Sequence, residues 1–148
     1  MIVCKTFSFA AAHFLTKYHG KCERLHGHNY RLSVAVSGPI GENGMVVDFV
    51  LLKKLVAEKI IDHLDHFCLN DFFENPTAEN LAKWIWDELS PLSQKISALI
   101  DDPNFPAEIA QNLRDAKNAK LDRVNPEIVL HEIILWETDD SFVIYRGK

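Results

Sequence analysis

The sequence lacks long apolar runs and an excess of basic residues. Among its 148 residues no apolar run exceeds four, whereas a membrane-spanning helix needs about 20. Acidic residues outnumber basic ones by 21 to 16, which gives a net charge of −5. The broad basic surface of a nucleic-acid-binding domain is therefore missing. We expect neither a membrane nor a nucleic acid among the partners.

Cysteine is also scarce, with three residues and no CxxC pair. An odd number without close pairs argues against a disulfide framework and against a cysteine-based zinc site. The first residues also lack the basic and then apolar segments of a signal peptide. These absences predict a cytoplasmic protein with reduced thiols. Cys4 and Cys68 have apolar neighbours, and we expect both to be buried and unreactive.

Apolar residues make up 47% of the chain, and the length is typical of one domain with a single core. Apolar residues recur at helical spacing after Asp48 and after Thr77, which can cap the helices that begin there. Alternating patterns predict four strands, over 2–13, 28–38, 127–137 and 142–146. The order ββααββ predicts an α+β fold, in which two helices cover one face of a four-stranded antiparallel sheet.

The stretch between the second helix and the third strand does not fit this regular order. Aspartates and prolines interrupt it, and only a thin apolar stripe supports a polar helix over 108–120. We interpret residues 93–126 as a surface insertion in a single domain that spans 1–148.

Three histidines form a candidate metal site. His26 and His28 lie two residues apart in an extended segment, so their imidazoles point to the same side. That pair alone fits a metal site or a half-exposed strand edge. His13 ends the first predicted strand and lies beside the pair if the two strands are neighbours. Three histidines without a nearby fourth ligand suit a catalytic zinc ion, although imidazole also binds copper, nickel and iron.

Cys22 lies four residues before His26, next to Lys21 and near Arg24. Cationic surroundings lower the pKa of a thiol and favour the thiolate. Beside a metal ion, Cys22 could act as a base or nucleophile, while a fourth metal ligand and an ordinary loop thiol are the alternatives. Arg24, Lys21 and Lys17 form a local basic patch, which either receives an anionic substrate group or is simply solvated.

Two carboxylates are further candidates. Asp65 precedes His66, and a carboxylate can fix the tautomer of a histidine and raise its basicity. Adjacent residues do not always touch, so this pair is a weak signal. Glu137 follows an apolar strand and is either a surface charge or an anchor for the N–H groups of a ligand.

Several motifs occur together in an order that resembles the 6-pyruvoyltetrahydropterin synthase family, in particular the bacterial 6-carboxytetrahydropterin synthase branch of queuosine biosynthesis. The resemblance covers residues 2–92 and 127–148. The motifs are FxxAH at 9–13, CxxxHGH at 22–28, VVDF at 46–49, LDHxxLN at 64–70, ENPTxE at 74–79 and WET at 136–138.

The resemblance implies the tunnelling fold, whose subunits form trimeric barrels that usually stack as hexamers, with active sites at subunit interfaces. It also implies a zinc ion held by His13, His26 and His28. The substrate would be 7,8-dihydroneopterin triphosphate, and the products would be 6-carboxy-5,6,7,8-tetrahydropterin, acetaldehyde and triphosphate.

The same resemblance assigns roles to other residues. Cys22, as thiolate, would move protons at the substrate side chain, and Asp65 with His66 would be the complementary acid–base group. Glu137 would bind the 2-amino and N3 donors of the pterin. Thr77 and Glu79 match the family motif near the pterin pocket. From charge alone we add Arg24, with its two neighbouring lysines, as a contact for the triphosphate.

Glu23 leaves a second activity open. A relative of this family in folate synthesis has a glutamate in place of the cysteine, with the motif ExxHGH, and releases 6-hydroxymethyl-dihydropterin. Residues 23–28 match that motif as well, so Glu23 is a further candidate for substrate contact. A pterin- or purine-binding module without catalysis is the third hypothesis, and the intact Cys22, Asp65 and His66 argue against it.

Overall fold

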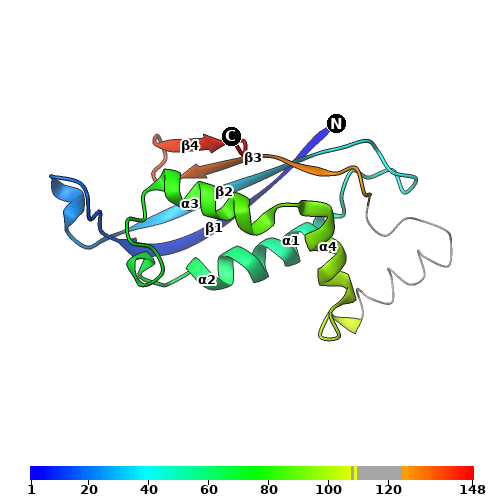
Figure 1. Cartoon of the computed structure of the whole chain (residues 1–148), viewed down its shortest axis with the longest axis horizontal. Helices are drawn as coiled ribbons and strands as arrows, with labels where there is room; N and C mark the ends of the chain where they lie inside the picture. The colour runs from blue at the N-terminus through cyan, green and yellow to red at the C-terminus, as the bar shows by residue number, and fades with distance from the viewer. Residues whose placement is uncertain (108, 110–124) are drawn as a thin grey trace.

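A computed structural model describes residues 1–107, 109 and 125–148 of the chain. Its sheet has four antiparallel strands in the order β1-β2-β3-β4 (Figure 1). The strands are β1 (Ile2–His13), β2 (His26–Ser37), β3 (Val129–Trp136) and β4 (Phe142–Tyr145). All four predicted strands are therefore confirmed, with ends shifted by one or two residues.

The helices lie on one side of this sheet (Figure 1). Helix α1 (Phe49–Val56) continues through a π-helical turn, η2 (Ala57–Ile61), into α2 (Asp62–Leu64). The second predicted helix is α3 (Ala78–Leu89). Both predicted caps are present, because Asp48 Oδ1 accepts from the Val50 amide at 2.7 Å and Thr77 Oγ1 accepts from the Asn80 amide at 3.3 Å.

Alternation along the strands separates a covered face from an open one. On β1, Phe9, Ala11 and His13 are buried under the helices, whereas Cys4 is exposed on the other face. The expectation of a buried Cys4 was wrong, because neighbours in a strand point to opposite faces and share no environment. Cys68, also expected to be buried, is only partly covered.

A third helix, α4 (Leu92–Asp101), begins where we expected a surface insertion. Leu92, Ile96 and Leu99 are buried in the core, so this part of the stretch contributes to the fold. The spacing of these three residues is helical, and the neighbouring prolines and aspartates obscured it. The polar helix predicted over 108–120 lies almost wholly outside the described residues. Within the described residues, no helix is long and apolar enough to span a membrane.

Candidate active site

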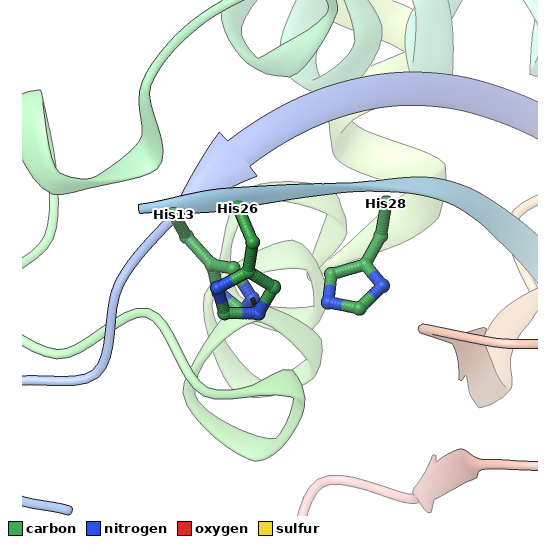
Figure 2. Close-up of side chains that lie close together, drawn as sticks. All are labelled: His13, His26 and His28. Carbon is green, nitrogen blue, oxygen red and sulfur yellow. Dashed lines mark hydrogen bonds between the residues drawn. The ribbon is translucent and has the colours of Figure 1, made fainter. Parts of the chain in front are cut away.

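The three candidate metal ligands come together at one end of the β1–β2 pair. His13 is directly opposite His26 in the strand register, and His28 follows two residues later on the same side. Figure 2 shows the three rings below the two strands. One ring nitrogen from each residue lies within 4.8 Å of the others, so the group could hold a metal ion.

Backbone carbonyls set the tautomers of two of these rings. His13 Nδ1 lies 2.9 Å from the Pro76 carbonyl, and His26 Nδ1 lies 2.7 Å from the Arg24 carbonyl. A carbonyl oxygen can only accept, so each Nδ1 carries the hydrogen and each Nε2 presents a lone pair. This is the arrangement that metal-binding histidines use.

The distance between those two nitrogens also fits a shared cation. His13 Nε2 and His26 Nε2 are 3.1 Å apart. Two nitrogens that bind one tetrahedral zinc ion at about 2.0–2.1 Å lie about 3.3 Å from each other. The donor set therefore fits a three-histidine metal site in both chemistry and spacing.

Glu137 lies against this group. Its Oε1 is 3.5 Å from His13 Nε2 and 3.9 Å from His28 Nε2. Burial lowers the pKa of His28, and the Glu137 charge partly opposes that effect. A neutral His28 is the form that can bind a metal ion.

A pocket of about 350 Å³ opens next to Glu137. Thr77 and Glu79, from the start of α3, line the same pocket. The structure thus brings together the three residues that the family resemblance assigned to pterin binding. Carboxylates accept hydrogen bonds from N–H groups, so the pocket suits a ligand with several ring donors.

Cys22 lies in the short helix η1 (Lys21–Glu23), at the end of the loop between β1 and β2. Its carbonyl accepts from the Leu15 amide at 2.9 Å, which ties this part of the loop to the residues just after His13. The neighbouring Glu23 carboxylate is paired with His19 Nδ1 at 3.1 Å. Both partners are exposed, so this ion pair holds Glu23 only weakly.

The residues of the basic patch differ in the contacts that they make. Lys17 forms an ion pair of 3.0 Å with Glu74, in which both side chains are exposed. Arg24 is also exposed, while its backbone carbonyl is the partner of His26. Arg24 is therefore connected through its main chain to His26, one of the candidate metal ligands.

Asp65 and His66 form a real contact. Asp65 Oδ2 is 3.0 Å from His66 Nδ1, and Asp65 Oδ1 accepts from the Ala10 amide at 2.8 Å. The Ala10 amide and, after it, His66 lower the pKa of the Asp65 carboxyl. A carboxylate oxygen can only accept, so this contact favours a hydrogen on His66 Nδ1 and leaves Nε2 directed away from Asp65.

His66 has a positive φ of 64°, which is uncommon for a residue other than glycine. Its amide donates to the Ala10 carbonyl at 2.6 Å, so β1 holds the segment in this conformation. Strained residues that neighbours hold in place often serve a functional site.

The segment that carries this dyad runs along the free edge of β1, where the Ala12 amide donates to the Phe67 carbonyl at 3.0 Å. His66 borders a hollow of about 440 Å³ on β1 and β2, whose lining includes Ala10, Ala12, Gly27 and His28. One candidate metal ligand, His28, therefore borders the same hollow as His66. Within the described residues of one chain, no hydrogen bond or ion pair joins the dyad to the three histidines.

Sequence reasoning did not assign two residues that support the site. Asn70 accepts from the Phe14 amide and donates to the Phe14 carbonyl, both at 2.9 Å, and so fixes the chain just after His13. Tyr30 is wholly buried beside His13. Asn70 ends the LDHxxLN motif, and Tyr30 comes two residues after the CxxxHGH motif. Neither side chain is charged or a common metal ligand, and these were the signals by which candidate residues were chosen.

Comparison with known proteins gives consistent matches. The family model described as 6-pyruvoyl tetrahydropterin synthase matches residues 2–102. The 6-carboxy-5,6,7,8-tetrahydropterin synthase of Haemophilus influenzae is 30% identical over 153 residues, covering 97% of each chain. The protein of the same name from Synechocystis sp. is 45% identical over 95 residues, which are 60% of this chain and 74% of the relative.

A relative with another name is similar over a shorter region. The dihydroneopterin monophosphate aldolase of Pyrococcus furiosus is 44% identical over 82 residues, which are 55% of this chain and 68% of the relative. Among solved structures, 6-pyruvoyl tetrahydropterin synthase of Caenorhabditis elegans superposes with a TM-score of 0.68 at 25% identity, covering 100% of this chain and 96% of that one. The chain therefore belongs to the 6-pyruvoyl tetrahydropterin synthase family.

Proposed function

We propose that this protein converts 7,8-dihydroneopterin triphosphate, with water, to 6-carboxy-5,6,7,8-tetrahydropterin, acetaldehyde and triphosphate. The reaction would serve queuosine (7-deazaguanine) biosynthesis in the cytoplasm. The observation that carries the proposal is the three-histidine group, which lies beside a pocket lined by Glu137, Thr77 and Glu79. The two relatives with this name support the same activity.

The pterin ring would bind in that pocket. Glu137 would accept hydrogen bonds from the 2-amino group and N3, and both bonds would be strengthened by its charge. Thr77 and Glu79 lie on the same wall, where they can contact the ring edge. Arg24 would meet the triphosphate from the loop side. The substrate side chain would then extend toward the histidines.

Zinc is the metal that we assign to His13, His26 and His28, where it would act as a Lewis acid on the side-chain hydroxyls of the substrate. The Cys22 thiolate would take protons from the side-chain carbons. His66, oriented by Asp65, would return protons to them. Two separate acid–base groups can in this way serve opposite sides of one substrate.

The zinc assignment gives a direct prediction. Replacing His26 by alanine is expected to reduce bound zinc from about one ion per subunit to a small fraction, because two histidines alone form a poor tetrahedral site. Metal analysis after dialysis measures this. The matched control is His63→Ala, which removes an exposed histidine of α2 and should leave the zinc content unchanged. Full zinc retention in His26→Ala would contradict the ligand assignment.

The complete active site would need a second copy of the chain. Among the described residues of one chain, no hydrogen bond or ion pair joins the Asp65–His66 dyad to the three histidines, and the dyad segment lies along the edge of β1. A neighbouring subunit could place its dyad against the metal group of the first. The edge of β4, and the part of the β1 edge before Ala10, also carry backbone groups that pairing between subunits would satisfy. We infer a homo-oligomer, either a trimer or a hexamer, with shared sites.

The alternative is cleavage to 6-hydroxymethyl-dihydropterin, alone or as a second activity. The match of residues 23–28 to the folate-branch motif and the Pyrococcus furiosus aldolase favour it. Glu23 is exposed and only weakly paired with His19, whereas Cys22 matches the motif of the first activity. A pterin-binding module without catalysis would have no use for the oriented dyad.

A product assay separates these possibilities. The zinc-loaded protein is incubated with 7,8-dihydroneopterin triphosphate, and the products are identified by chromatography and mass. We expect 6-carboxy-5,6,7,8-tetrahydropterin and acetaldehyde. Formation of 6-hydroxymethyl-dihydropterin alone would establish the alternative, and binding without turnover would leave the non-catalytic module.

A further inference from the structure

Asn75 lies in the ENPTxE motif, and the proposed mechanism does not use it. Its side chain is partly buried, three residues before the first residue of α3. Asn75 Oδ1 accepts from the Thr16 amide at 3.1 Å, although the two residues are 59 positions apart in the chain. Asn75 therefore connects the loop after β1 to the segment that leads into α3.

The neighbours of Asn75 hold the same part of the loop. The Thr16 hydroxyl donates to the Glu74 carbonyl at 3.0 Å. Three residues before Thr16, His13 Nδ1 donates to the Pro76 carbonyl at 2.9 Å. Three consecutive residues of the motif thus fix both ends of the segment 13–16, which we call the connecting segment.

The connecting segment carries or holds several groups of the candidate active site. Its first residue, His13, is a candidate metal ligand. Leu15 lines the proposed pterin pocket, and its amide donates to the Cys22 carbonyl at 2.9 Å. The peptide group held by Asn75 through the Thr16 amide is the next one along the chain. The position of Cys22 therefore depends on a backbone that Asn75 fixes from the other side.

The main chain of Asn75 contacts the wall of the pocket. Its carbonyl accepts from the Thr77 amide at 2.9 Å and from Asn80 Nδ2 at 2.8 Å. Thr77 is the N-cap of α3 and lines the pocket. One residue is thus bonded through its side chain to the segment that holds Cys22, and through its main chain to the start of α3.

We propose that Asn75 is a positioning residue, whose side-chain oxygen sets the place of Cys22 relative to the pocket that receives the pterin. This inference rests on the proposed function, in which the Cys22 thiolate takes protons from the substrate side chain. The ring would be bound from the α3 side, while the base approaches the reacting carbons from the loop side. Because a misplacement of about 1 Å can cost about 10²-fold in rate, the distance between these two sides matters for turnover.

Removing the oxygen should lower kcat and leave KM nearly unchanged, because the contact acts on the base and not on the bound ring. Asn75→Leu keeps a side chain of similar size but cannot accept from Thr16, and we expect kcat to fall by about 10–100-fold. Asn75→Asp keeps the acceptor and should retain most of the parent kcat. Among the described residues the Asn75 amide nitrogen makes no hydrogen bond, so aspartate loses no contact there.

The experiment measures two quantities on the zinc-loaded protein. Initial rates with 7,8-dihydroneopterin triphosphate give kcat and KM, and hydrogen–deuterium exchange gives the protection of the Leu15 and Thr16 amides. Exchange should be faster in Asn75→Leu and as slow as in the parent in Asn75→Asp. Asn75→Ala removes the same oxygen without the leucine branches and separates the lost bond from a packing effect.

Asn125→Leu is the matched control, because it removes another asparagine that connects distant parts of the chain. Asn125 Nδ2 donates to the Pro39 carbonyl at 2.9 Å, beyond the end of β2 that is opposite His26. This variant should keep the parent kcat and the parent exchange of the connecting segment.

Faster exchange with a lower kcat in both Asn75→Leu and Asn75→Ala, and recovery of both quantities in Asn75→Asp, is the expected result. Unchanged exchange, an unchanged kcat, a change in KM alone, or an Asn75→Asp as impaired as Asn75→Leu would each overturn the inference, while turnover by the parent keeps the proposed function intact. If the parent itself forms no 6-carboxy-5,6,7,8-tetrahydropterin, the proposed function is wrong, and the role of Asn75 falls with it.

Discussion

Replacing Cys22 by alanine is expected to reduce formation of 6-carboxy-5,6,7,8-tetrahydropterin by about 10²–10⁴-fold, the usual effect of removing a general acid–base group. Cys22 lies in η1, which is tied by a backbone hydrogen bond to the residues just after His13. Initial rates with 7,8-dihydroneopterin triphosphate, measured by chromatography of the products, test this expectation.

The neighbouring glutamate gives the contrasting variant. Glu23→Ala should keep the parent rate of this reaction, because the motif that this activity resembles has its acid–base cysteine at Cys22 and not at Glu23. Cys4→Ala controls for the loss of a thiol, since Cys4 is exposed on the open face of β1. If Glu23→Ala loses activity and Cys22→Ala does not, Glu23 is the acid–base group and the folate-branch activity is the better assignment.

Two inactive variants should restore activity when they assemble together. Cys22→Ala damages the half of the site next to the candidate metal group, and His66→Ala damages the Asp65–His66 dyad, which a neighbouring subunit would supply. In mixed oligomers, some interfaces combine the intact Cys22 of one subunit with the intact His66 of its neighbour. If the two variants mix equally and at random in a ring, about a quarter of the sites should be complete. Oligomers of either variant alone have almost no complete site.

The measurement is the rate of the co-expressed variants, purified through different tags. Co-expression of Cys22→Ala with His26→Ala is the matched control, because both changes affect the same half of the site and no interface becomes complete. Sedimentation should show trimers or hexamers in each case. A stable monomer, or a mixture as inactive as its components, would contradict shared sites.

Local patterns in the sequence were sufficient to predict most of the fold. Alternation predicts all four strands, and a side-chain oxygen before an apolar helical stripe predicts the starts of α1 and α3. The histidine group is predictable for the same reason. His26 and His28 share a face because the period of a strand is two, and His13 joins them because adjacent strands pair antiparallel. These features depend on residues that are close in the chain or in neighbouring strands.

Other features depend on contacts between distant parts of the chain, which no local pattern encodes. Whether Cys4 is buried depends on which face of the sheet the helices cover, and the contribution of α4 to the core depends on how it packs. The sequence shows that Asp65 precedes His66, but only the left-handed turn held by Ala10 brings their side chains together.

The sequence by itself determined the chemistry of this protein: which residues can bind a metal, move protons and accept ring donors. The tertiary structure decided which of those groups lie next to one another. It places Glu137 beside the histidines, and it pairs the segment of the Asp65–His66 dyad with the edge of β1 at Ala10. The physical reason is that residue type sets the reactivity of a group, whereas strand register and layer packing set its neighbours.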